Sequence, residues 1–98
     1  MEGMRLFFEP ASVALVGATE SKGAVGRIVL DNLLLARDRR KIYPVNPNRE
    51  KILDVKCYPN LSSLPETPDL AVVVTNAKLV PDIVEEGGKA GIKNMIII

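Results

Sequence analysis

The most informative stretch of this 98-residue chain is Ser12-Val13-Ala14-Leu15-Val16-Gly17-Ala18-Thr19-Glu20-Ser21-Lys22-Gly23-Ala24-Val25-Gly26. Its first five residues are typical of a buried strand, and the residues after it, from Val25 to Ala36, repeat apolar side chains at helical spacing. Glycines between a strand and a helix let backbone amides approach a phosphate, whose charge the helix N-terminus favours. This order predicts a Rossmann-like unit with an anion site.

The rest of the chain continues the alternation of strand and helix. We expect strands at 41–46, 69–75 and 94–98, a short extended piece within 51–59, a single turn at 61–65 and a second helix at 78–90. The first helix should bury Val25, Ile28, Val29, Leu33 and Ala36, with Leu30 and Leu34 widening the same stripe, and the second should bury Leu79, Ile83 and Val84. With right-handed crossovers, this pattern gives an α/β fold, a Rossmann-like parallel sheet with helices on both faces.

Composition excludes several classes of function. Thirteen basic and twelve acidic residues give a net charge of +1, so no overall field attracts nucleic acid. Histidine is absent and Cys57 is the single cysteine, which leaves no disulfide, no metal site and no catalytic histidine. No apolar run approaches the roughly 20 residues of a membrane span. A reduced, cytoplasmic setting is expected.

The glycine loop alone does not fix the ligand. Gly17, Gly23 and Gly26 are too widely spaced for G-x-G-x-x-G, and Lys22 stands where a P-loop needs glycine. A phosphate cradle and a purely structural turn therefore both remain open.

The residues at the end of the second strand narrow the choice of ligand. An NAD site places an acidic residue there, whereas this chain has Asn46, Pro47 and Arg49. An arginine can make a bidentate contact with a phosphate monoester. Coenzyme A, with its 3′-phosphate, and NADP, with its 2′-phosphate, both fit, and spacing does not separate them. Arg49 can also be an ordinary surface charge.

Several segments resemble, in order, the CoA-binding domain that opens the NDP-forming acyl-CoA synthetases, relatives of the succinyl-CoA synthetase α subunit. They are Leu6-Phe7-Phe8-Glu9-Pro10-Ala11-Ser12-Val13-Ala14-Leu15-Val16-Gly17-Ala18-Thr19, Val25-Gly26, Tyr43-Pro44-Val45-Asn46-Pro47-Asn48, Val55-Lys56-Cys57-Tyr58-Pro59, Asp69-Leu70-Ala71-Val72 and Val80-Pro81-Asp82-Ile83-Val84-Glu85-Glu86. The resemblance covers essentially the whole chain, and implies that residues 1–98 form one CoA-binding domain.

The resemblance also implies a set of ligand contacts. The glycine loop would wrap the diphosphate, the end of the second strand would hold the adenosine 3′-phosphate, and the turn after the third long strand would line the path of the pantetheine arm. These residues are Gly17, Ala18, Thr19, Glu20, Ser21, Lys22, Gly23, Gly26, Val45, Asn46, Pro47, Arg49, Thr75, Asn76 and Ala77. The family's usual Pro and Lys of the loop are here Lys22 and Ala24, and Asn48 stands where Lys is common.

The function that the resemblance implies is binding of CoA as the N-terminal domain of an acyl-CoA synthetase that forms ADP or another nucleoside diphosphate. Without a histidine to phosphorylate, the chain alone is expected to form no acyl-CoA, and it would need the remaining ligase domains or a second subunit. The alternatives are a stand-alone CoA-binding or sensing protein and an NADP-binding redox-regulatory module. The apolar ending Met95-Ile96-Ile97-Ile98 suggests a fragment cut after the fourth long strand, or a chain that self-associates.

Overall fold

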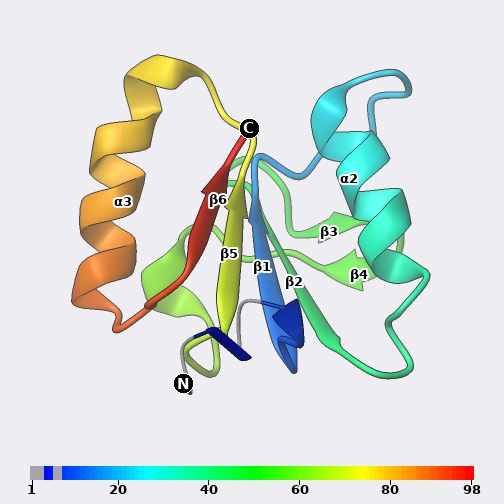
Figure 1. Ribbon diagram of the computed structural model, residues 1–98. Helices are drawn as coiled ribbons and strands as arrows, with labels where there is room; N and C mark the ends of the chain where they lie inside the picture. The colour runs from blue at the N-terminus through cyan, green and yellow to red at the C-terminus, as the bar shows by residue number, and fades with distance from the viewer. Residues whose placement is uncertain (1–3, 6–7) are drawn as a thin grey trace.

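A four-stranded parallel sheet carries the fold of the chain, of which the computed structural model describes residues 4–5 and 8–98 (Figure 1). The strand order is β2-β1-β5-β6, with bounds Lys41–Val45, Ser12–Val16, Leu70–Val73 and Met95–Ile97. All three pairings are parallel. The expected Rossmann-like sheet is confirmed.

Two helices cover the sheet, one on each side. α2 (Val25–Leu34) joins β1 to β2, and α3 (Val80–Lys89) joins β5 to β6, after a short 3-10 turn, η2 (Ala77–Leu79). Because these two connections leave the sheet's centre in opposite directions, right-handed crossovers place α2 and α3 on opposite faces (Figure 1). The core is accordingly divided into two apolar clusters, one containing Leu30 and the other Ile83.

The segment between β2 and β5 adds no strand to the main sheet. A two-stranded antiparallel hairpin, β3 (Lys51–Ile52) and β4 (Val55–Lys56), is followed by a 3-10 turn, η1 (Leu61–Ser63). Ile52 is fully buried in the cluster beneath α2, which ties the hairpin to that face. Tyr58 extends the pairing of β2 through a bridge to Val45.

The expected helical faces are confirmed in part, because Val29, Leu30, Leu33 and Leu34 of α2 lie in or against the core, whereas other expected residues do not. In α2 the side chain with no exposure is Leu30, whereas Val25 and Ile28 are each 51% exposed. The apolar stripe of α2 is wide, so contact with the sheet and the hairpin selects which of its residues are buried. In α3, Ile83 packs against the core but Val84 is exposed, and Leu79, which ends η2, is exposed as well.

The two ends of the chain carry exposed apolar residues. Of the apolar residues Leu6, Phe7 and Phe8 before β1, the first two lie outside the described residues, and Phe8 is exposed. At the other end, β6 pairs with β5 on one side only, and Ile97 and Ile98 are 53% and 63% exposed. Self-association through this edge stays a prediction. Within the described residues, no helix is long and apolar enough to cross a membrane.

Candidate functional site

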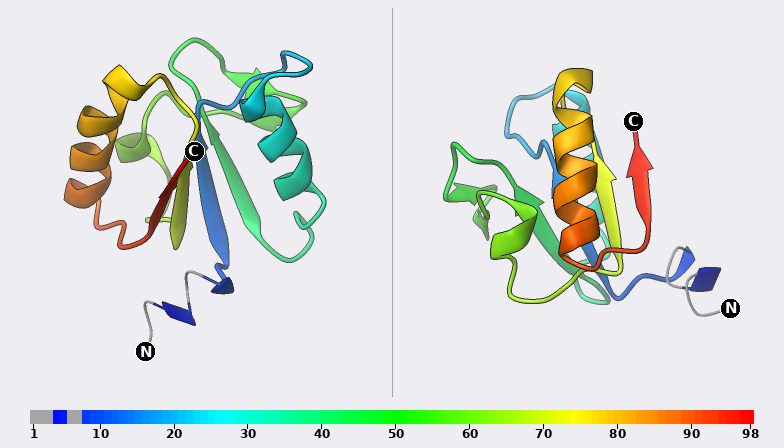
Figure 2. Two further views of the ribbon diagram at one scale, coloured as in Figure 1. Left: turned by 45° about the horizontal axis from the view of Figure 1, so that its top comes forward. Right: turned by 90° about the vertical axis from the view of Figure 1, so that its left-hand side faces the viewer.

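A cavity of about 390 Å³ lies at the carboxyl ends of the strands, the end turned toward the viewer in the left panel of Figure 2. At this edge of the sheet, the chain leaves β1 toward one face and β5 toward the other. Ligands of open parallel sheets bind at such switch points. The cavity is lined by Val16, Gly17, Val45, Asn46, Pro47, Asn48, Pro59, Asn60, Thr75, Leu79, Asp82, Ile83 and Glu86.

Two glycines bring the first strand and the first helix into backbone contact. Gly17 has φ of +98°, and its amide donates to the Val45 carbonyl oxygen at 3.1 Å. A Cβ atom added at Gly26 would lie 2.2 Å from the carbonyl oxygen of Gly17. Gly26 is therefore required for the close approach of α2 to the end of β1. This is the packing role expected of a glycine at the start of a Rossmann helix.

The loop between these glycines is held by short-range contacts. The Thr19 Oγ1 atom accepts from the Ser21 amide at 3.2 Å. Arg27, in the first turn of α2, donates from Nη1 to the Glu20 carbonyl oxygen at 2.6 Å and pairs through Nε with Asp31 at 3.1 Å. Sequence reasoning missed Arg27, because its partner is a backbone carbonyl seven residues earlier and no local pattern indicates it.

Asn46 joins the glycine loop to the end of β2. Its Nδ2 atom donates to the Ala18 carbonyl oxygen at 2.9 Å, and its Oδ1 atom accepts from the Asn48 amide at 2.8 Å. Its backbone amide donates to the Tyr58 carbonyl oxygen at 2.9 Å. The side-chain amide thus positions two loops at once. Its expected part in holding the adenosine 3′-phosphate end of the ligand stays a prediction.

Arg49 lies next to the cavity rather than in it. It lines a neighbouring hollow of about 450 Å³ together with Glu50 and Cys57. The cavity and the hollow share Pro47, Asn48 and Pro59, so they adjoin each other at this turn. Among the described residues, the Arg49 guanidinium has no ion-pair partner. Burial raises the pKa of the Cys57 thiol, which disfavours the thiolate.

The start of α3 forms the opposite wall. Asn76 caps η2 through Oδ1, which accepts from the Lys78 amide at 3.0 Å. Glu86 accepts from the Leu61 amide through Oε1 at 3.0 Å. Sequence reasoning missed the lining residues Leu79, Asp82, Ile83 and Glu86, although their spacing of three and four residues places them on one helical face.

The predicted site residues divide into three groups. Five of them line the cavity: Gly17, Val45, Asn46, Pro47 and Thr75. Arg49 lines the adjacent hollow. The remaining ones are not part of the lining: Ala18, Thr19, Glu20, Ser21, Lys22, Gly23, Gly26, Asn76 and Ala77. Ala18 is fully buried, which leaves only its backbone available to the loop's neighbours.

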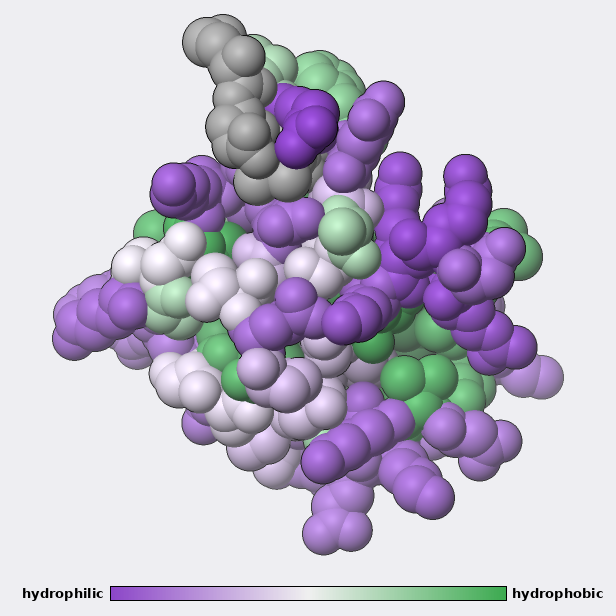
Figure 3. All heavy atoms as spheres, turned by 90° about the horizontal axis from the view of Figure 1, so that it is seen from below, coloured by the Kyte–Doolittle hydropathy of each residue, from purple (hydrophilic) through white to green (hydrophobic). Residues whose placement is uncertain are grey.

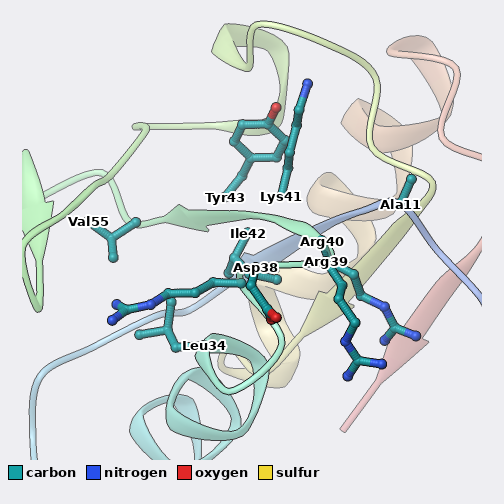
Figure 4. A pocket seen from close by; sticks show the side chains of 10 residues that line it. Ala11, Leu34, Asp38, Arg39, Arg40, Lys41, Ile42, Tyr43 and Val55 are labelled. Carbon is teal, nitrogen blue, oxygen red and sulfur yellow. The ribbon is translucent and has the colours of Figure 1, made fainter.

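A larger cavity, of about 650 Å³, lies at the other end of β2 and is lined by Arg37, Arg39, Arg40 and Lys41. Figure 3 views the molecule from this end, where long hydrophilic side chains project. The side chains of Arg39 and Arg40, which precede β2, extend to one side of the strand, and that of Lys41 extends to the other (Figure 4). Because these cationic side chains do not all converge on one point, we do not assign an anion-binding site to this cavity.

Lys41 is instead part of a polar cluster with Tyr43 and Glu66. The Lys41 Nζ atom lies 3.4 Å from Glu66 Oε2, and the Tyr43 hydroxyl donates to the same oxygen. Burial, followed by the hydrogen bond to Glu66, raises the pKa of Tyr43 to about 12. The same hydrogen bond lowers the pKa of Glu66. The described residues contain no group of three or more potential metal ligands.

The family model described as CoA binding domain matches residues 11–98. The chain belongs to the CoA-binding domain family. The relatives described next confirm the resemblance to NDP-forming acyl-CoA synthetases, and the cavity described above is the candidate site of a CoA-binding domain.

The curated relatives are CoA ligases. The chain is 41% identical over 95 residues to acetate–CoA ligase [ADP-forming] II of Archaeoglobus fulgidus, covering 97% of this chain and 14% of the relative. It is 36% identical over 99 residues to the alpha subunit of acetate–CoA ligase [ADP-forming] I of Pyrococcus furiosus, covering 97% of this chain and 21% of that subunit. The domain therefore spans a small part of the ligases that it matches.

Solved structures of two lengths share the fold. Dinucleotide forming acetyl-coenzyme A synthetase 1 of Ca. Korarchaeum cryptofilum, in complex with phosphate and ADP, matches with a TM-score of 0.89 at 34% identity, over 97% of this chain and 20% of that one. A conserved hypothetical protein from Pyrococcus furiosus matches with a TM-score of 0.80 at 33% identity, over 89% of this chain and 73% of that one.

Proposed function

We propose that this chain binds coenzyme A as the CoA-binding domain of an ADP-forming acyl-CoA synthetase. The observation that carries the proposal is the meeting of Gly17, the Asn46-Pro47 turn and Thr75 around one cavity at the carboxyl ends of the strands. Membership of the CoA-binding domain family and the names of the curated relatives support the choice of ligand.

The shape of the site suits an elongated ligand. The hollow lined by Arg49 adjoins the cavity at the Pro47 turn, so one elongated molecule that crosses this turn would reach both. Val16, Val45 and Ile83 supply an apolar surface for the uncharged part of such a ligand. Arg49 supplies a cation at the far side of the Pro47 turn, where a phosphate monoester would be held. CoA combines these features in one molecule.

Titration calorimetry with CoA and dephospho-CoA tests the proposal. Loss of one charge-assisted phosphate contact weakens binding by roughly 1.5–3 kcal/mol, so dephospho-CoA should bind about 10- to 150-fold more weakly than CoA. Arg49→Ala should weaken CoA to the level of dephospho-CoA and leave dephospho-CoA unchanged. Arg39→Ala removes an equal charge at the opposite end of β2 and should change neither affinity. Undetectable binding of CoA, or equal binding of both ligands, would contradict the proposal.

In catalysis, we propose that this domain supplies binding alone. The chain contains no histidine to carry a phosphoryl group. The nucleotide site and the phosphorylated group would come from further ligase domains or from a second subunit. A turnover assay with acetate, CoA and ATP should give no acyl-CoA from the 98-residue polypeptide, and clear product would overturn this part of the proposal.

A stand-alone CoA-binding protein is the second candidate. The match to 73% of a conserved hypothetical protein favours it, because that chain has room for little more than this domain. The binding experiment gives the same result for both candidates. The open reading frame around the domain separates them, since the ligase requires a nucleotide-binding partner. An NADP-binding module is tested by an added titration with NADP, which should bind more weakly than CoA.

A further inference from the structure

The two helices that follow β1 and β5 differ in what their first turns offer a ligand. α2 begins after Ala24, which gives no side-chain cap, and no acidic residue lies in its first turn. The amides at this end and the helix dipole therefore favour an anion. Lys22, in the loop just before it, adds an exposed cation.

The start of α3 has the opposite character. Asn76 already caps the turn before it, and Pro81 removes one backbone donor from the first helical turn. Asp82 places a carboxylate in the same turn, beside the cavity. Glu86 follows one turn later on the same wall. A phosphate placed here would meet two carboxylates, so this wall repels the charged part of a ligand.

Asp82 and Glu86 are not equivalent. Glu86 already accepts the Leu61 amide at 3.0 Å. Among the described residues, the Asp82 carboxylate accepts no side-chain or loop hydrogen bond and belongs to no ion pair. A carboxylate at the edge of an apolar cavity is suited to a neutral N–H donor. In CoA, the two amides of the pantetheine arm are such donors.

We infer that Asp82 is a specificity-determining residue of this site, which accepts a hydrogen bond from a pantetheine amide and keeps the phosphates of the ligand on the α2 side. The inference rests on the proposed function. Asp82 then sets the direction in which CoA lies, with its anionic end toward α2 and Arg49 and its neutral arm along α3.

Two ligands and two variants test this role by titration calorimetry. Adenosine 3′,5′-bisphosphate carries the adenosine phosphates of CoA but lacks the pantetheine arm. Asp82→Ala should weaken CoA about 10-fold and should not weaken adenosine 3′,5′-bisphosphate. The matched control is Glu85→Ala, which removes one negative charge from the same helix. Glu85 pairs with Lys89 at 3.2 Å and does not line the cavity, so this variant should bind both ligands like the unaltered chain.

Each other outcome overturns the inference. Tighter CoA binding by Asp82→Ala would mean that the carboxylate faces a phosphate. Equal weakening of both ligands would assign Asp82 to the adenosine end, and an unchanged affinity for CoA would leave it without a role. If the unaltered chain binds CoA, any of these results removes the inference alone. If it does not bind CoA, the proposed function fails as well.

Discussion

The two crossover units of the fold, β1-α2-β2 and β5-α3-β6, share one topology but differ in how the helix contacts the strand next to it. In the first, backbone meets backbone: Gly26 allows α2 to approach the carbonyl oxygen of Gly17. In the second, side chains make the contact: a Cβ atom at Gly87 would meet the terminal methyl group of Met95. A contact between backbones cannot relax, whereas a methionine can change rotamer. The first unit should therefore be the less tolerant of substitution.

Gly26→Ala should have the largest effect. Alanine is the better helix former by about 1 kcal/mol, but its methyl group would lie 2.2 Å from the Gly17 carbonyl oxygen. Since neither backbone can move without breaking the pairing of β1, we expect a net loss of roughly 3 kcal/mol of unfolding free energy. Urea unfolding followed by circular dichroism measures it. A loss below about 1 kcal/mol would show that the first unit is as pliable as the second.

Asn46→Ala should come next. It leaves the Ala18 carbonyl oxygen and the Asn48 amide without their side-chain partners. Each loss leaves a polar group without a hydrogen-bond partner, so we expect the unfolding free energy to fall by about 1–3 kcal/mol. CoA affinity should fall too, since the glycine loop loses its link to β2. The matched control is Asn32→Ala on the exposed surface of α2, expected within about 0.5 kcal/mol of the unaltered chain.

Gly87→Ala and Gly88→Ala probe the second unit. Both positions lie in α3, and nothing lies within 4 Å of a Cβ atom at Gly88. Gly88→Ala should stabilise the fold by about 0.5–1 kcal/mol through helix propensity. Gly87→Ala gains the same propensity but must displace the Met95 methyl group, so the two terms should nearly cancel. If Gly87→Ala costs as much as Gly26→Ala, the contrast between the units fails.

The contact between Tyr43 and Glu66 links β2 to the segment before β5, and its effect should be the smallest. The pKa of Tyr43 is raised to about 12 from 10.0, so its neutral form contributes stability below pH 10 that is lost as the pH rises toward 12. In a Tyr58→Phe background, absorbance at 295 nm should report the Tyr43 ionisation alone. Glu66→Gln should lower that midpoint but leave it above 10, because burial is the larger cause. A midpoint near 10 with Glu66 present would contradict this picture.

The contribution of Glu66 has the opposite dependence on pH. Its pKa is lowered in the folded chain, so its stabilising contribution is present above the usual range of a glutamate and is lost as the pH falls through the lowered value.

The sequence was sufficient for the strands, because each buried strand is a continuous apolar run between polar turns. It was insufficient for the buried face of α2, where Val25 and Ile28 compete with Leu30 and only contact with the hairpin decides. At the site, the resemblance implied that the glycine loop, the end of β2 and the turn after β5 hold one ligand, and a parallel sheet brings these three segments to the same edge. The α3 wall was missed because Asp82 and Glu86 have the pattern of a solvated helix surface, and nothing local indicates that they face a cavity.

Strand β1 has a further consequence for the motions of the chain. All five of its residues are buried, and it pairs with a neighbour on each side. Its amides should therefore exchange with deuterated solvent only when the whole domain unfolds, while those of α3 and the edge strand β6 exchange through local opening. A ligand that contacts both β1 and α3 would stabilise α3 against local opening by mass action. Slowed exchange in α3, rather than in β1, would then be the signature of an occupied site.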